Sequence, residues 1–201
     1  MNSNYINEYI NLFERVLSAA YISKFSLEAL AKNISNSDYF QKIERDLKES
    51  SPITSDYVLV KSILTDINIA LEDVPIFNQC LWAAESYLRI QGETKLTFET
   101  IFLYIPIKKM YELFDVYHEM AFSQIVEHFK KLFLNKSVLA MLIDTYKISI
   151  KYISEITDVS YNTLLSLKSR RRNIKKSNAV DILQIASVFN VRPETLCEIE
   201  I

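Results

Sequence analysis

The chain has 201 residues, which is enough for one domain or for two of roughly a hundred residues each. Hydrophobic residues make up 49% of it, charged residues 24%, and the net charge is −2, which is the balance of a soluble globular protein. A single glycine and only four prolines exclude a sheet-rich fold, because the turns between strands need many glycines. We therefore predict an all-α protein.

The same sequence offers no sign of a membrane segment, a metal site or a disulfide. No apolar run approaches the length that crosses a bilayer, and the N-terminus lacks the pattern of a secretory signal, so we expect a cytoplasmic protein. Cys80 and Cys197 lie far apart and are interpreted as small buried apolar residues. His118 and His128 stand in no metal-ligand spacing, so we expect no metal and no cofactor.

The first 47 residues predict three helices. Apolar residues recur every three to four positions over 5–21, and two shorter helices are predicted over 26–34 and 38–47. The last two resemble a degenerate helix-turn-helix, with a turn one residue short and no basic loop after it. We interpret this pair as packing or a fossil repeat, with DNA contact as the lesser alternative.

Residues 48–55 predict a loop, and a helix over 57–69 ends at the break of 71–75. The next helix is predicted over 77–91, with Gly92 in the left-handed position that ends it.

A dense apolar block follows. Thr97 is expected to cap a short helix over 98–104, and Pro106 suits the first turn of another that runs to Asp115. The block consists of Phe98, Ile101, Phe102, Tyr104, Ile105, Ile107, Met110, Tyr111, Leu113, Phe114, Val116 and Tyr117. We interpret it as the core of an N-terminal domain, the alternative being a dimer interface or a ligand pocket.

A helix over 120–134 and a short separator at 135–137 complete the first part of the chain. We predict a multi-helix domain over 1–135, for dimerisation and for a ligand or partner, and a second domain over 136–201. Residues 137–201 carry nine Lys or Arg against seven Asp or Glu, whereas residues 1–136 carry fourteen against eighteen.

The most informative stretch is 149–172, which predicts two short helices joined by a tight turn. Ser149 caps a helix over 150–157, with Ile150, Ile153 and Ile156 at helical spacing. Val159 is expected to fill the corner at the turn, and Ser160 caps a second helix over 161–168.

The second helix divides its faces in the way a groove-reading helix needs. Leu164 and Leu167 form an inward stripe, and Tyr161, Asn162 and Ser166 lie on the outer side. The nine residues 168–176 then contain six cations and no acid, which suits contact with phosphates. The alternative is an ordinary helix pair with a solvated basic loop.

These features resemble a helix-turn-helix domain of the Cro/cI repressor type, the XRE-like family. The resemblance covers residues 137–198 and implies five helices, of which the last two are expected at 178–189 and 193–200. The matching motifs are Ile153-Ser154, Val159-Ser160-x-x-Thr163-Leu164, Ile174, and Ile182-Leu183-Gln184-Ile185-Ala186-x-x-Phe189-x-Val191.

The resemblance also implies which residues contact DNA. Base contacts are expected from Tyr161, Asn162 and Ser166. Phosphate contacts are expected from Ser149, Thr163, Arg170, Arg171 and Arg172. Apart from the resemblance, we expect the nearby cations Lys151, Lys168, Lys175 and Lys176 to bind DNA as well.

Three positions depart from the family pattern. Asp158, in the turn, and Arg170, after the reading helix, stand where the family usually has glycine; Asp tolerates a left-handed backbone better than most residues, whereas Arg170 alters the loop more. Lys168 replaces the family's acid, and Asp144 lies near its usual partner's position, so we hypothesise a charge-swapped Asp144–Lys168 pair.

No glycine-rich phosphate loop, nucleophile motif or paired histidines point to catalysis, and we expect no enzyme. The predicted function is a DNA-binding transcriptional regulator, most simply a repressor, acting as a homodimer on double-stranded DNA. The alternative is a protein-interaction module, similar to an antitoxin or an anti-defence protein, whose N-terminal domain binds a protein partner and whose helix-turn-helix only controls its own promoter.

Overall fold

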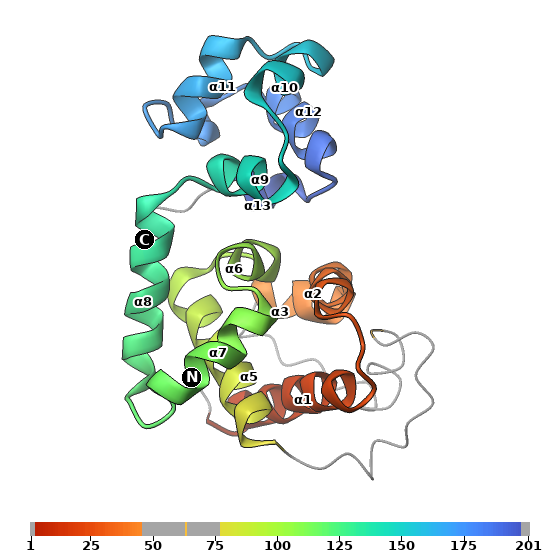
Figure 1. The fold of residues 1–201 in the computed structure, drawn as a ribbon, viewed down its shortest axis with the longest axis vertical. Coiled ribbons are helices and arrows are strands. Elements are labelled where there is room, and N and C mark those ends of the chain that lie inside the picture. The colour runs from red at the N-terminus through yellow and green to blue at the C-terminus, as the bar shows by residue number, and fades with distance from the viewer. Residues whose placement is uncertain (1–2, 46–62, 64–76, 198–201) are drawn as a thin grey trace. The chain divides into compact units, whose positions relative to one another are not determined.

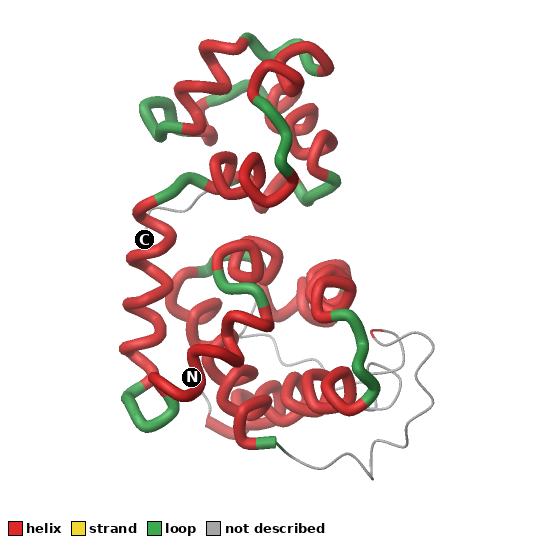
Figure 2. The backbone as a smooth tube through the Cα atoms, in the orientation of Figure 1, coloured by secondary structure: helices red, strands yellow, loops and turns green. Residues whose placement is uncertain are grey.

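The computed structural model describes residues 3–45, 63 and 77–197 of the chain. Within these ranges all regular structure is helical and the helices are joined by short loops, as Figure 2 shows, so the predicted all-α class is confirmed. The chain separates into two compact units, Met1–Glu127 and His128–Ile201, and the division falls inside helix α8 (Phe122–Asn135).

The first unit contains six further helices that the structure describes, labelled in Figure 1. They are α1 (Ser3–Ile22), α2 (Leu27–Asn36), α3 (Asp38–Arg45), α5 (Asn78–Thr94), α6 (Phe98–Tyr104) and α7 (Ile107–Tyr117). Each lies where the periodicity predicts a helix, and Thr97 caps α6 as expected. The predicted loop at 48–55, helix at 57–69 and break at 71–75 fall outside the described residues, Ile63 excepted.

The core of this unit is built on α1 and α5, which pack along each other, while α5 also contacts α6 and α7. The Phe13 ring lies at its centre, with centroids 4.9 Å from Phe40 and 5.9 Å from both Tyr87 and Phe98. The buried Tyr87 hydroxyl donates to the Ile105 carbonyl at 2.8 Å, so the one polar atom of this ring is satisfied.

Most of the apolar block at 98–117 belongs to this core. Eight of its twelve residues are buried, while Val116 is exposed. Helices α2 and α3 also turn apolar residues inward, among them Leu30, Ile34, Phe40 and Ile43. Packing is therefore a sufficient role for the pair that resembles a degenerate helix-turn-helix.

Helix α5 does not end at Gly92 as predicted. It continues to Thr94, and Lys95 takes the left-handed position with φ 58°, while Gly92 has negative φ. The longer helix buries Thr94, whose hydroxyl donates to the Ile90 carbonyl at 2.7 Å. Burial of this last turn decides the helix end in place of the local preference of glycine.

The second unit follows α8 with α9 (Val138–Tyr146), α10 (Ile150–Ile156), α11 (Tyr161–Lys168), the 3₁₀ turn η2 (Ile174–Lys176), α12 (Ala179–Phe189) and α13 (Pro193–Leu196). Helix α9 packs against α11 and α13, α10 against α11, and α12 against α13. Its core includes Ile153, Leu164, Ile185, Phe189 and Leu196. The order of the five helices is the one the resemblance implies, with α13 shorter than expected within the described residues.

In the part of the chain that the structure describes, none of the helices combines the length and the apolar character needed to cross a bilayer. Cys80 is buried and Cys197 half-buried, and both are free thiols.

Candidate nucleic-acid interface

Helices α10 and α11 are joined by a corner that side-chain hydrogen bonds hold on both sides. Ser149 accepts from the Tyr152 amide at 3.1 Å and Ser160 accepts from the Thr163 amide at 3.2 Å, so both predicted N-caps are confirmed. Val159 is 3% exposed and fills the corner as expected. The Ser154 hydroxyl donates to the Val159 carbonyl at 3.0 Å, which ties α10 to the turn.

Two details of this corner were not predicted from the sequence. Asp158 does not take a left-handed conformation, so the turn follows a path that any L-residue adopts. Its carboxylate accepts from the Gln184 side chain of α12 at 3.0 Å. Of the three isoleucines at helical spacing only Ile153 is buried, and Ile156, where α10 ends, is 51% exposed.

Helix α11 presents two rows of side chains on its outer side. Leu164 and Leu167 are buried and anchor the helix, as predicted. Tyr161 and Leu165, four residues apart, form one row, and Asn162 and Ser166 form the next. Tyr161 is 49% exposed, Asn162 is exposed, and Leu165 and Ser166 are half-buried.

The loop after α11 presents four exposed cations, Arg171, Arg172, Lys175 and Lys176. Ile174 is buried between them and holds the loop against the unit. Asn173 accepts from the Lys175 amide at 2.9 Å and so caps η2. The cations therefore extend from an anchored backbone, which lowers the entropy lost when they bind phosphates.

Arg170 does not belong to this set of exposed cations, contrary to the prediction that it contacts phosphate. Its guanidinium donates to the carbonyls of Phe133, Leu134 and Lys136, at 2.6, 2.7 and 2.9 Å, and lies 5.0 Å from the centroid of the Phe133 ring. These carbonyls lie at and just beyond the end of α8, where the helix itself provides no donors. Arg170 is thus a structural residue that caps α8 from the end of α11.

Arg170 makes this contact from a left-handed backbone with φ 54°, the conformation that the family's glycine supplies. The loop therefore keeps the left-handed bend although the glycine is replaced. The strain of that conformation in an arginine is offset by the three hydrogen bonds of its side chain.

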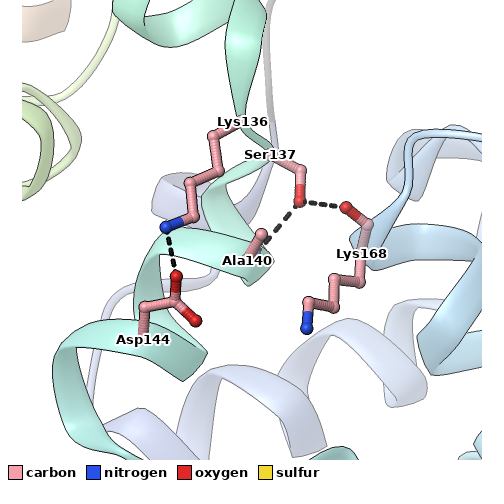
Figure 3. Close-up of polar contacts among 5 residues, drawn as sticks. All are labelled: Lys136, Ser137, Ala140, Asp144 and Lys168. Carbon is pink, nitrogen blue, oxygen red and sulfur yellow. Dashed lines mark hydrogen bonds and ion pairs between the residues drawn. The ribbon is translucent and has the colours of Figure 1, made fainter.

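The hypothesised Asp144–Lys168 pair is wrong. Figure 3 shows that the Asp144 carboxylate instead forms a hydrogen-bonded ion pair with Lys136, the residue just beyond the end of α8. This hydrogen bond is the main cause that holds the pKa of Asp144 below its usual value, and the charges of Lys168 and Lys147 contribute less. Lys168 therefore lies near Asp144 without pairing with it.

Ser137 connects the start of α9 to the end of α11. Its hydroxyl accepts from the Ala140 amide at 3.1 Å, capping α9, and donates to the Lys168 carbonyl at 2.7 Å (Figure 3). The residue is 3% exposed. Sequence reasoning missed this role, although a serine ahead of an apolar helical run is a recognisable N-cap signal.

Three other residues that were predicted to contact the DNA backbone are accessible to solvent to different degrees. Ser149 is exposed at the start of α10. Lys151 is exposed and forms an ion pair of 3.8 Å with Glu155, which a phosphate can replace at little cost. Thr163 is half-buried, and its hydroxyl accepts from that of Ser160 at 3.0 Å.

The first unit holds a buried polar cluster away from this surface. The Glu14 carboxylate accepts from the Ser18 hydroxyl at 2.5 Å, and burial is the main cause that raises the pKa of Glu14. Cys80 lies 3.7 Å from the Tyr111 hydroxyl, and burial raises the pKa of both groups. The described residues contain no group of three or more His, Cys, Asp or Glu that could hold a metal ion.

Comparison with known proteins finds no family model, no curated protein and no solved structure that matches the chain. The surface formed by α11 and the loop 169–176 is therefore the candidate functional site of this chain.

Proposed function

We propose that this chain is a sequence-specific DNA-binding transcriptional regulator, most simply a repressor, in which α11 enters the major groove. The observation that carries the proposal is the juxtaposition of an exposed outer face on α11 with four exposed cations in the loop that follows it. The XRE-like motifs and the order of the helices support the same function.

The proposed roles are divided by chemistry. Arg171, Arg172, Lys175 and Lys176 bind phosphates and set the general affinity and its dependence on salt. Tyr161, Asn162 and Ser166 contact base edges and set sequence preference, while Ser149, Lys151 and Thr163 position the helix pair on the backbone. Arg170 is left out of the DNA-contacting set, and Lys168 is retained only as a flanking charge.

We further propose that the protein acts as a homodimer in the cytoplasm and has no enzymatic activity. A dimer places two copies of α11 in successive major grooves about 34 Å apart, which requires a near-palindromic operator. The first unit then supplies dimerisation or binds an effector.

The experiment that tests the proposal compares two variants of the full chain on duplexes selected from a random library. Arg171→Ala is expected to weaken binding to every duplex alike and to reduce the salt slope by about 0.9 for each half-site, the value for one phosphate contact per protomer. Asn162→Ala is expected to relax preference at one or two base pairs, at a cost of about 1–3 kcal/mol for the preferred site. Lys108, an exposed cation of α7, provides the control, since Lys108→Ala removes the same charge far from α11 in the sequence.

The competing proposal is a protein-interaction module of the antitoxin or anti-defence type. It has less support from the described residues, because most of the apolar block that suggested an interface is buried. If the selection enriches no duplex and Arg171→Ala binds DNA as the wild type does, the regulator proposal is wrong and the interaction module takes its place.

A further inference from the structure

We infer that α11 selects A·T base pairs, and that Leu165 together with Tyr161 recognises the methyl groups of thymine. The inference rests on the proposed function and adds to it the class of sequence that is read. It also assigns a specificity role to Leu165, which is not among the base contacts that the resemblance implies.

The first step is the arrangement of the outer face of α11. Tyr161 and Leu165 are four residues apart and form an apolar row, and Asn162 and Ser166 form a hydrogen-bonding row beside it. Adjacent rows on one helix reach adjacent positions in a groove. The face thus combines apolar contact with donors and acceptors over a few base pairs.

The second step is the chemistry of base edges in the major groove. Thymine presents a methyl group that apolar side chains contact, and adenine presents the N6 and N7 atoms that asparagine bonds with both ends of its amide. Guanine is most often read by arginine or lysine, and cytosine by a carboxylate. Asn162 and the Tyr161–Leu165 row match adenine and thymine.

The third step is what α11 lacks. The structure describes every residue of this helix, and its sequence YNTLLSLK contains no acid and a single cation, Lys168. Lys168 lies at the C-terminal end, where its charge acts on Asp144 of α9 and its carbonyl is bonded to Ser137. Between Tyr161 and Ser166 the outer face therefore has neither a cation to contact guanine nor a carboxylate to contact cytosine.

The exposed loop cations agree with this assignment. Arg171 and Arg172 follow the helix end, and the Arg171 guanidinium is already engaged with the Ser169 hydroxyl at 2.9 Å. Their positive charge complements the phosphates on either side of the groove, and it supplies affinity for any sequence. Preference for A·T pairs must then come from the two rows of α11.

The test uses the full chain and the duplex that it enriches most from a library with a random stretch of about 20 base pairs, the span of two half-sites. Each thymine of that duplex is replaced in turn by uracil, which removes the methyl group and leaves the hydrogen-bonding edge intact. We expect A·T pairs at the positions that respond to Asn162→Ala. We also expect uracil to weaken binding about threefold to fourfold at each contacted thymine, which is the worth of one buried methyl group.

Leu165→Ala is expected to abolish the effect of uracil at one thymine per half-site and to leave the salt slope unchanged. Leu183→Ala is the matched control, because Leu183 is a 55% exposed leucine on α12 and the same atoms are removed. It should keep the full response to uracil. Thermal unfolding followed by circular dichroism verifies that both variants fold, which their partial exposure favours.

The two proposals fail in different ways. Enrichment of a specific duplex with G·C pairs at the Asn162-sensitive positions, or with no response to uracil at any thymine, overturns the inference and leaves the regulator standing. Enrichment of no duplex at all overturns both.

Discussion

Removal of the Arg170 side chain tests the contact that most distinguishes this unit from the motif it resembles. The guanidinium makes three hydrogen bonds of 2.6–2.9 Å to carbonyls of residues 133, 134 and 136 and lies over the Phe133 ring. In Arg170→Ala these carbonyls lose a charged donor, and water replaces it only in part because two of the three bonds are partly buried.

The expected loss follows from these contacts. A hydrogen bond to a charged group contributes roughly 1.5 kcal/mol at the lower end, and the three are not additive because they share one donor group. The ring contact adds about 0.5 kcal/mol at a partly exposed site. We therefore expect Arg170→Ala to destabilise the second unit by about 2–3 kcal/mol.

Arg170→Gly separates the side-chain contacts from the strain of the backbone. It loses the same hydrogen bonds but relieves the left-handed conformation, φ 54°, which costs an L-residue roughly 1 kcal/mol. The glycine variant should thus be more stable than the alanine variant by about 1 kcal/mol, and less stable than the wild type.

Native-state hydrogen exchange of amides in α9 and α11 is the suitable assay, because it reports the second unit directly. The control is Arg172→Ala, an exposed neighbour, which should change stability by less than about 0.5 kcal/mol while weakening DNA binding. An alanine variant as stable as the wild type, or a glycine variant less stable than alanine, would refute the structural role assigned to Arg170.

Three further changes test other contacts of the two units. Ser137→Ala removes both the cap of α9 and the bond to the Lys168 carbonyl, so hydrogen exchange in α9 should reveal a loss of about 2 kcal/mol, and an unchanged rate would contradict the double role. Lys147→Gly relieves a left-handed helix end with φ 57° and should stabilise the unit by about 0.5–1 kcal/mol in the same measurement, where a loss would count against it. Burial raises the pKa of Glu14 above its unfolded value, so the protonated carboxyl favours the folded first unit at low pH, and this contribution is lost as the pH rises from 4.5 through the raised pKa. Urea unfolding followed by the fluorescence of Trp82, the chain's only tryptophan, should show the wild type losing stability relative to Glu14→Gln over that range, and a constant difference would contradict it.

Features fixed by local chemistry could be predicted from the sequence. Ser149, Ser160 and Thr97 cap helices as expected, because an N-cap depends on a hydroxyl and on amides two or three residues away. Helix α11 also begins and ends at the predicted residues, since Ser160 caps its start and Leu164 and Leu167 define its buried stripe.

Features decided by contacts between distant residues could not be predicted in this way. Arg170 lies in a run of cations that resembles a phosphate-binding loop, and only the position of the α8 carbonyls, 34 to 37 residues earlier, gives it another role. The partner of Asp144 could not be predicted because Lys136 lies just before residues 137–198, which carry the resemblance. The predicted end of α5 at Gly92 is wrong for a related reason, since burial of Thr94 outweighs the local preference of glycine for a helix end.

The central claim, that α11 and the following loop bind duplex DNA, is tested most directly by an NMR titration. The ¹⁵N-labelled full chain is titrated with the best-enriched duplex, and the changes in amide shifts are mapped onto the sequence. The account predicts that the largest changes fall on residues 161–176. Shift changes confined to the first unit would contradict it, and so would the absence of any shift change when the duplex is in large excess.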